Sequence, residues 1–196
     1  MKLKVFLASL LLFPFLSIAA TQAAKMSQDV PKSDSTTMTK STQTRNQDAV
    51  TVAFIIALDK NEIAAAKLAM RKKGIDPNVM NYAKMMIAAH AQHLKNTVVL
   101  ARQLGLKPRE TAAVVDLRVK GTRFLSQLRS LQGKDFDKTY IAGMVRGHMD
   151  ALTLVNQLAK NTSNMNLKNY LMQTNAVIKA HLQEAKKIQN QLKKMS

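Results

Sequence analysis

Cysteine is absent from this chain of 196 residues. Its absence excludes disulfide frameworks, thiolate metal sites, iron–sulfur clusters and cysteine nucleophiles, so any metal chemistry must use nitrogen or oxygen ligands. Tryptophan is absent too, and there are only 6 glycines and 4 prolines. Because so few residues favour turns, the composition predicts an all-α protein and argues against all-β and doubly wound folds. The length suits one compact domain plus a tail.

Acidic residues are also scarce: 12 Asp and Glu face 30 Lys and Arg, a net charge of +18. Such a field attracts anionic surfaces, so phospholipid headgroups and lipopolysaccharide are candidate partners, with an attraction that weakens as salt rises. Nucleic acid is disfavoured, since the 9 aromatic residues are not interleaved with the basic runs. The alternative is that the charge serves solubility alone. Oligomeric state leaves no signature.

The N-terminus has the three parts of a secretory signal peptide. Lys2 and Lys4 precede an apolar stretch over residues 5–18, and small residues follow as far as Ala23, where we expect cleavage. The stretch is shorter than the roughly 20 residues that a membrane-spanning helix needs. The sequence therefore predicts a leader over residues 1–23, export to the periplasm or the medium, and no transmembrane segment in the mature chain.

Residues 24–46 are rich in Ser, Thr, Lys and Gln and lack aromatic residues. Such a segment cannot bury enough apolar surface to offset the entropy lost on ordering, so we expect a flexible tether there. A single domain over residues 47–196 then remains.

Helix-boundary signals divide this domain into four long helices and a shorter one. Gly74 and Gly105 suit helix ends, and Asp76 followed by Pro77 is a strong start signal. The long helices carry apolar positions at alternating steps of three and four, which is the pattern of a bundle core. The predicted fold is an antiparallel four-helix bundle with the shorter helix between the second and third long ones; the expected helices span residues 48–73, 76–105, 111–132, 135–160 and 166–196.

Four ionisable residues, one in each long helix, interrupt these apolar faces: Glu62, His90, His148 and His181. Each lies near the middle of its expected helix, so packing the helices side by side places all four in one central layer. A buried polar group without a partner costs roughly 1 to 3 kcal/mol, so four of them must satisfy one another or hold something. Three imidazoles and a carboxylate suit a divalent transition metal such as Zn, Fe, Mn, Ni or Cu, or else a small ligand. The alternative is a hydrogen-bonded network that fixes helix register.

Three more residues could support this layer, because each lies three positions from one of its members: Asp59, His93 and Glu184. A ferritin-type di-iron centre is disfavoured, since it needs Glu three residues before His, where this chain has Ile87, Val145 and Ile178. The chain also lacks a nucleophile elbow, a phosphate loop and a paired-carboxylate motif. An enzyme is therefore disfavoured, and metal-dependent redox or hydrolytic chemistry at the layer is the enzymatic reading that stays open.

Several segments resemble a bacterial family of exported proteins with a domain of unknown function. The resemblance spans residues 47–191 and lies in residues 61–69, 85–90, 131–140, 144–148 and His181, with Phe-Asp-x-x-Tyr followed by His as its most specific part. It implies a ferritin-like helical bundle, export, and a polar layer at the Glu and three His positions, but no reaction. The family's Tyr140 either guards an entrance to the layer or fills the end of the core, and we favour the second role.

Overall fold

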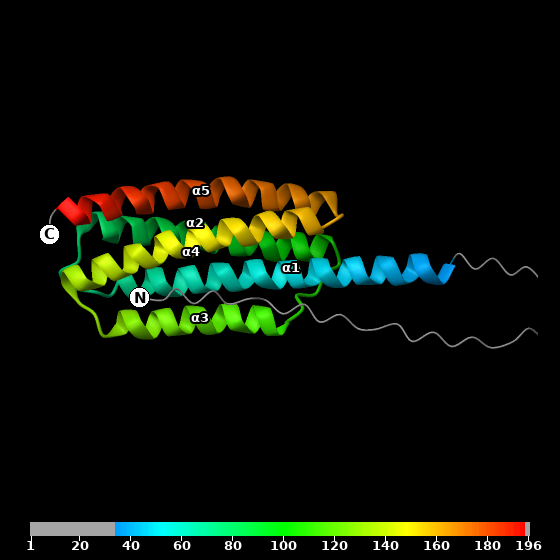
Figure 1. Ribbon diagram of the computed structural model, residues 1–196, viewed down its shortest axis with the longest axis horizontal. Helices are drawn as coiled ribbons and strands as arrows, with labels where there is room; N and C mark the ends of the chain where they lie inside the picture. The colour runs from blue at the N-terminus through cyan, green and yellow to red at the C-terminus, as the bar shows by residue number, and fades with distance from the viewer. Residues whose placement is uncertain (1–33, 195–196) are drawn as a thin grey trace, which may run out of the picture. The chain divides into compact units, whose positions relative to one another are not determined.

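The computed structural model describes residues 34–194, and all regular secondary structure in this part of the chain is α-helical. The expected leader and residues 24–33 of the expected tether lie outside the described residues. The prediction of an all-α domain is confirmed. The helices are α1 (Asp34–Ala69), α2 (Pro77–Gln103), α3 (Ala112–Arg129), α4 (Gly133–Asn161) and α5 (Met165–Lys194), as Figure 1 shows.

The four long helices form a bundle in which every pair of neighbours is antiparallel. α1 and α2 form one hairpin, α4 and α5 form the other, and contacts of α1 with α4 and of α2 with α5 close the ring (Figure 1). The shorter α3 packs outside on α1 and carries the chain from the end of α2 back to the start of α4. This single long crossover is the connectivity of ferritin-like bundles. The predicted fold class is confirmed, including the extra helix.

Helix α2 begins and ends where the sequence predicts. The side chain of Asp76 caps its start by accepting a hydrogen bond from the backbone N–H of Asn78 at 2.7 Å, and Pro77 is the first helical residue. At its other end Gly105 takes a φ of +63°, which only glycine adopts at little cost.

Helix α1 begins earlier than expected, at Asp34, so residues 34–46 are helical rather than an unstructured tether. Its first turns project beyond the other helices (Figure 1). Asp48, the expected cap, lies inside the helix and accepts a hydrogen bond of 2.6 Å from the hydroxyl of Thr162, directly after α4. Asp48 therefore marks the end of the bundle, although it does not mark the end of its helix.

The other boundaries differ by a turn or less. α1 ends at Ala69 rather than at residue 73, and α3 ends at Arg129 rather than at residue 132. α4 begins at Gly133, so Asp135 lies in its first turn and does not cap it. The side chain of Asn164 caps α5 by accepting a hydrogen bond from the backbone N–H of Leu167 at 3.0 Å.

The core consists of two main apolar clusters on either side of the histidines. Along α4, His148 lies between Val145 of one cluster and Ala151 of the other. Along α5, His181 lies between Ile178 and Leu182, which likewise belong to different clusters. The polar residues thus form a layer across the middle of the bundle. No helix within residues 34–194 has an apolar run long enough to cross a bilayer.

Candidate metal centre

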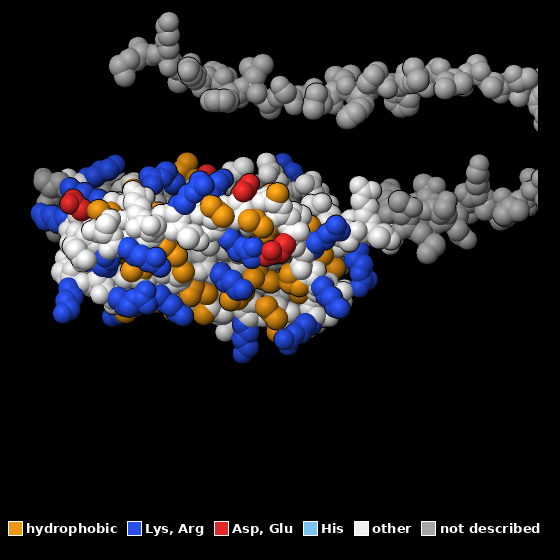
Figure 2. All heavy atoms as spheres, turned by 90° about the horizontal axis from the view of Figure 1, so that it is seen from below, with side chains coloured by type: hydrophobic (Ala, Val, Ile, Leu, Met, Phe, Trp, Pro, Cys, Tyr) orange, Lys and Arg blue, Asp and Glu red, His pale blue; other side chains and the backbone are white. Residues whose placement is uncertain are grey.

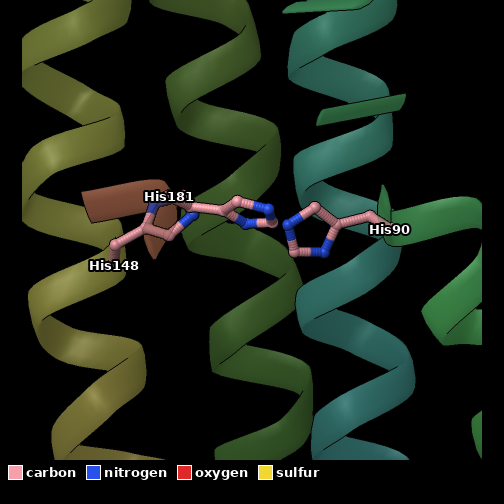
Figure 3. A group of neighbouring side chains, drawn as sticks. All are labelled: His90, His148 and His181. Carbon is pink, nitrogen blue, oxygen red and sulfur yellow. The ribbon is translucent and has the colours of Figure 1, made fainter. Parts of the chain in front are cut away.

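Three imidazole rings from three helices meet in this layer. His90 of α2, His148 of α4 and His181 of α5 are buried, and each offers a ligand atom within 4.8 Å of the other two. The ring centroids lie 5.2 Å apart for His90 and His181, 5.6 Å for His148 and His181, and 6.2 Å for His90 and His148. Figure 3 shows the rings turned toward one another.

Hydrogen bonds fix the orientation of two of these rings. The Nδ1 atom of His90 lies 2.9 Å from a carboxylate oxygen of Asp59, and Nδ1 of His148 lies 2.8 Å from the carbonyl oxygen of Met144. Because both partners only accept, the network assigns the proton of each ring to Nδ1 and leaves a lone pair on Nε2. Both Nε2 atoms and Nδ1 of His181 are buried without a hydrogen-bond partner.

Burial keeps the rings of His148 and His181 neutral at neutral pH. Burial and the neighbouring histidines together lower the pKa of His181 to about 4. Burial also lowers the pKa of His148, although the hydrogen bond to Met144 opposes the shift. A neutral imidazole is the form that binds a metal, so no proton need leave these two rings first.

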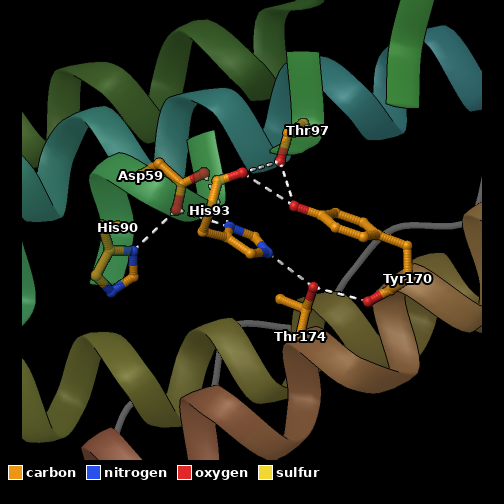
Figure 4. Close-up of polar contacts among 6 residues, drawn as sticks. All are labelled: Asp59, His90, His93, Thr97, Tyr170 and Thr174. Carbon is orange, nitrogen blue, oxygen red and sulfur yellow. Dashed lines mark hydrogen bonds and ion pairs between the residues drawn. The ribbon is translucent and has the colours of Figure 1, made fainter. Parts of the chain in front are cut away.

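A second polar network lies beside the three rings, along α2 and α5 (Figure 4). Asp59 lies 2.9 Å from Nδ1 of His93 as well as contacting His90, and Nε2 of His93 lies 2.9 Å from the hydroxyl of Thr174. The ring of His93 stacks on Tyr170, whose hydroxyl donates to the backbone carbonyl of His93 at 3.0 Å. His93 is therefore held on both edges and on one face, outside the group of three.

Thr97 completes this second network. Its hydroxyl lies 2.7 Å from that of Tyr170 and 3.0 Å from the carbonyl of His93. Sequence reasoning did not single out Thr97, Tyr170 or Thr174 as functional residues. The two threonines carried a signal, because they are polar residues on the otherwise apolar faces of their helices, but Tyr170 lies outside those faces.

Glu62 lines the same cavity as the three histidines, from α1, but its oxygens are not among the ligand atoms that lie within 4.8 Å of one another. Its Oε2 is buried without a partner. Burial, opposed by His90 and aided by Asp59, raises the pKa of Glu62 to about 7. The structure thus brings the three predicted histidines together and places the predicted carboxylate at the wall beside them.

The cavity between these side chains has a volume of about 30 Å³, and its other walls are mostly apolar, including Ile55, Leu58 and Ile178. A single water needs roughly 10 to 15 Å³ on this kind of measure. The space therefore suits one ion with a small ligand.

The two remaining candidates do not line the histidine cavity. Glu184 contacts Lys187 at 3.4 Å on the surface. Tyr140 is fully buried, with its ring stacked on Phe136 and edge-on to Tyr82, which is the core role that we favoured. Burial, with a contribution from Glu62, raises the pKa of Tyr140 well above its usual value, and its hydroxyl has no hydrogen-bond partner.

The family of proteins described as "Domain of unknown function (DUF4142)" matches residues 33–188. The chain belongs to this family. The match begins at the start of α1, so the family's domain includes the helical turns that the sequence reading assigned to a tether.

The fold also resembles a solved structure, "CopM in the Cu(II)-bound form". The TM-score is 0.56 at 16% sequence identity, over 74% of this chain and 96% of that one. At this identity the likeness supports the fold. No curated protein matches the sequence.

Proposed function

We propose that this DUF4142 protein binds one divalent transition-metal ion, held by His90, His148 and His181. The observation that carries the proposal is the convergence of three buried histidines from three helices, each with a buried ring nitrogen that has no hydrogen-bond partner. Leaving each unpaired costs roughly 1 to 3 kcal/mol, and a metal ion would satisfy all three at once. Asp59 and the Met144 carbonyl orient two of the rings from behind, as the outer partners of metal-bound histidines do.

The donor set narrows the choice of ion. Neutral imidazoles with a carboxylate nearby suit Zn²⁺, Cu²⁺, Ni²⁺ and Fe²⁺ more than the hard ions Mg²⁺ and Ca²⁺. The similar solved structure is a Cu(II)-bound form, which makes Cu(II) the first ion to test. We further propose that the protein is exported, because the leader-like residues 1–23 support entry into the secretory pathway.

The experiment is elemental analysis and Cu(II) titration of the purified mature protein. We expect one equivalent of metal per chain, and loss of binding when His148 and His181 are both changed to Ala. His93→Gln is the matched control, since it removes an imidazole that lies outside the group of three; it should keep the stoichiometry. A protein that takes up no Zn, Fe, Mn, Ni or Cu would instead assign the layer to fixing helix register.

A further inference from the structure

A groove of about 670 Å³ lies between α1, α3 and α4, on the outer side of the histidine layer. Its volume is in the range of ligand-binding clefts. Two contacts hold α3 over it. The side chain of Asn61 on α1 packs against Gly121 and donates a hydrogen bond of 2.9 Å to the carbonyl of Leu117, and the ring of Phe124 packs against Gly143 on α4. These contacts fix the position of α3, so the groove is a defined part of the fold.

The groove and the histidine cavity share part of one wall. Leu58, Glu62 and Ala151 line both spaces, and Glu62 is the polar residue among the three. Its buried Oε2 has no partner. Opposite it on α4 is Gly147, where a Cβ would lie 3.6 Å from Oε1 of Glu62. The lack of a side chain at Gly147 leaves the approach to this carboxylate open from the groove.

The groove also departs from the charge of the rest of the domain. Its walls carry three acids, Glu62, Asp116 and Asp150, against two bases, Lys120 and Arg146. Residues 47–196 as a whole carry 24 Lys and Arg against 10 Asp and Glu. On the face shown in Figure 2, hydrophobic side chains appear among scattered Lys and Arg, with few acids. A cation approaching this basic protein is repelled from most of the surface, and a groove whose acids and bases nearly balance repels it less.

We propose that this groove is the path by which a metal ion reaches the three histidines, and that Glu62 receives the ion at the shared wall. The inference rests on the proposed metal binding. A carboxylate at the wall replaces part of the water that the ion must lose before it enters a mostly apolar cavity. Glu62 thereby acts on the rate of loading, and the three imidazoles set the affinity.

The experiment follows Cu(II) loading of the metal-free protein by stopped-flow visible absorbance, with affinity measured separately by chelator competition. Gly147→Leu fills the approach to Glu62 and should slow loading at least tenfold, with stoichiometry and affinity unchanged within threefold. Glu62→Gln keeps the shape and removes the charge, so it should slow loading in the same way. Circular dichroism checks that both variants fold. If Gly147→Leu does not fold, the isosteric Glu62→Gln variant decides the question.

Val177→Phe is the matched variant on the side of the histidine cavity away from the groove, because Val177 lines the cavity from α5 and is 43% exposed. It should load at the wild-type rate. Slowing by Val177→Phe with normal loading of Gly147→Leu would place the entrance between α2 and α5 and overturn the proposal. Loss of equilibrium binding in Glu62→Gln would make Glu62 a ligand and overturn its transit role. If wild-type protein binds no ion, both proposals fail; if it binds one ion and Gly147→Leu loads normally, the route alone fails.

Discussion

At the scale of single residues, Asp59 does the most to organise the site. One carboxylate contacts Nδ1 of both His90 and His93, at 2.9 Å each, and it is almost fully buried. By accepting from His90 it presents the Nε2 lone pair of that ring to the cavity. By accepting from His93 it ties α1 to the Thr174 network on α5. A change at Asp59 should therefore act on metal affinity without removing a ligand.

Asp59→Asn tests this role. The amide keeps the size of the side chain. It offers only one oxygen acceptor, however, so its NH2 group must face Nδ1 of either His90 or His93, where a carboxylate oxygen now accepts. The tautomer of His90 is then no longer fixed. We expect Cu(II) affinity to fall roughly 10- to 100-fold, the usual effect of removing such an outer partner, with one equivalent still bound. Chelator competition measures it, with Glu184→Gln as the surface control. Unchanged affinity in Asp59→Asn would contradict the role.

Glu62 and His181 give the metal-free protein opposite pH dependences. The pKa of Glu62 is raised from 4.5 to about 7, so the folded state binds more protons than the unfolded state between those values, and stability falls as pH rises through the window. The pKa of His181 is lowered from 6.5 to about 4, so the unfolded state binds more protons, and stability falls as pH drops from 6.5 to 4. Where the windows overlap, the two contributions oppose each other.

Removing either group should expose the other. As pH rises from 4 to 6.5, the unfolding free energy of metal-free Glu62→Gln should increase by roughly 2 to 3 kcal/mol, because the contribution of His181 is left unopposed. As pH rises from 4.5 to 7, the unfolding free energy of metal-free His181→Asn should decrease by a similar amount. Urea denaturation at a series of pH values measures both slopes, with wild type as the flatter reference. Slopes of the same sign in the two variants would refute the assignment.

The three histidines could be found from the sequence. Helical periodicity places each on the apolar face of its helix, and a position near the middle of the helix fixes its level along the bundle. His90 is the midpoint of α2, and the small errors in the ends of α4 and α5 shift the expected height by less than a turn. Contacts that depend on side-chain rotamers could not be found. The spacing put Asp59 and His93 near the layer, but nothing in it showed that one carboxylate serves two rings, or that Glu62 stays at the wall.

At the scale of helices, α3 is an addition to a bundle that is closed without it. Glycines form the sites where it docks: Gly121 of α3 accepts Asn61, and Gly143 of α4 accepts the ring of Phe124. A Cβ at Gly143 would overlap that ring, whereas a Cβ at Gly147, one helical turn later, would meet Glu62 at an ordinary contact distance. The two glycines on α4 therefore make a matched pair for testing how α3 is held.

Gly143→Ala should displace Phe124 and loosen α3, at a cost of roughly 1 to 3 kcal/mol for the steric conflict, less the helix propensity gained by removing a glycine. Hydrogen exchange should show faster exchange in residues 112–129, with the long helices still protected. Gly147→Ala should leave exchange in α3 unchanged and gain the propensity of alanine. Equal protection of α3 in both variants would show that the Phe124 contact does not hold it.

The helix ends show where local signals suffice. Asp76-Pro77 and Gly105 were decisive because each fixes backbone geometry by itself. The start of α1 was missed because its Ser- and Thr-rich composition resembles a tether. Once the bundle has formed the rest of α1, however, each further turn adds hydrogen bonds without a new nucleation cost, and residues 34–48 contain no glycine or proline to stop it.

At the scale of the whole molecule, the excess of positive charge is the feature that the metal proposal leaves unused. Lys67, Arg71 and Arg129 line a pocket between α3 and the C-terminal end of α1, and no acidic residue lines it. Cations near an anionic membrane surface contribute about 1 kcal/mol each, so a few such groups acting together would give measurable binding. The expectation of an anionic surface as partner stays a prediction, and the pocket supplies residues with which to test it.

Protein without residues 1–23 should sediment with vesicles that contain phosphatidylglycerol at low salt, and should be released as salt rises, because the Debye length shrinks from about 30 Å at 0.01 M to about 3 Å at 1 M. Vesicles of phosphatidylcholine alone are the control for apolar adsorption. Changing Lys67, Arg71 and Arg129 to Gln removes three charges from one face and should weaken binding more than three Gln substitutions at exposed Lys107, Lys160 and Lys186. Equal weakening by the two triple variants would mean that net charge alone attracts the protein to the membrane. A failure to sediment with anionic vesicles even at the lowest salt would leave the basic surface with a role in solubility only.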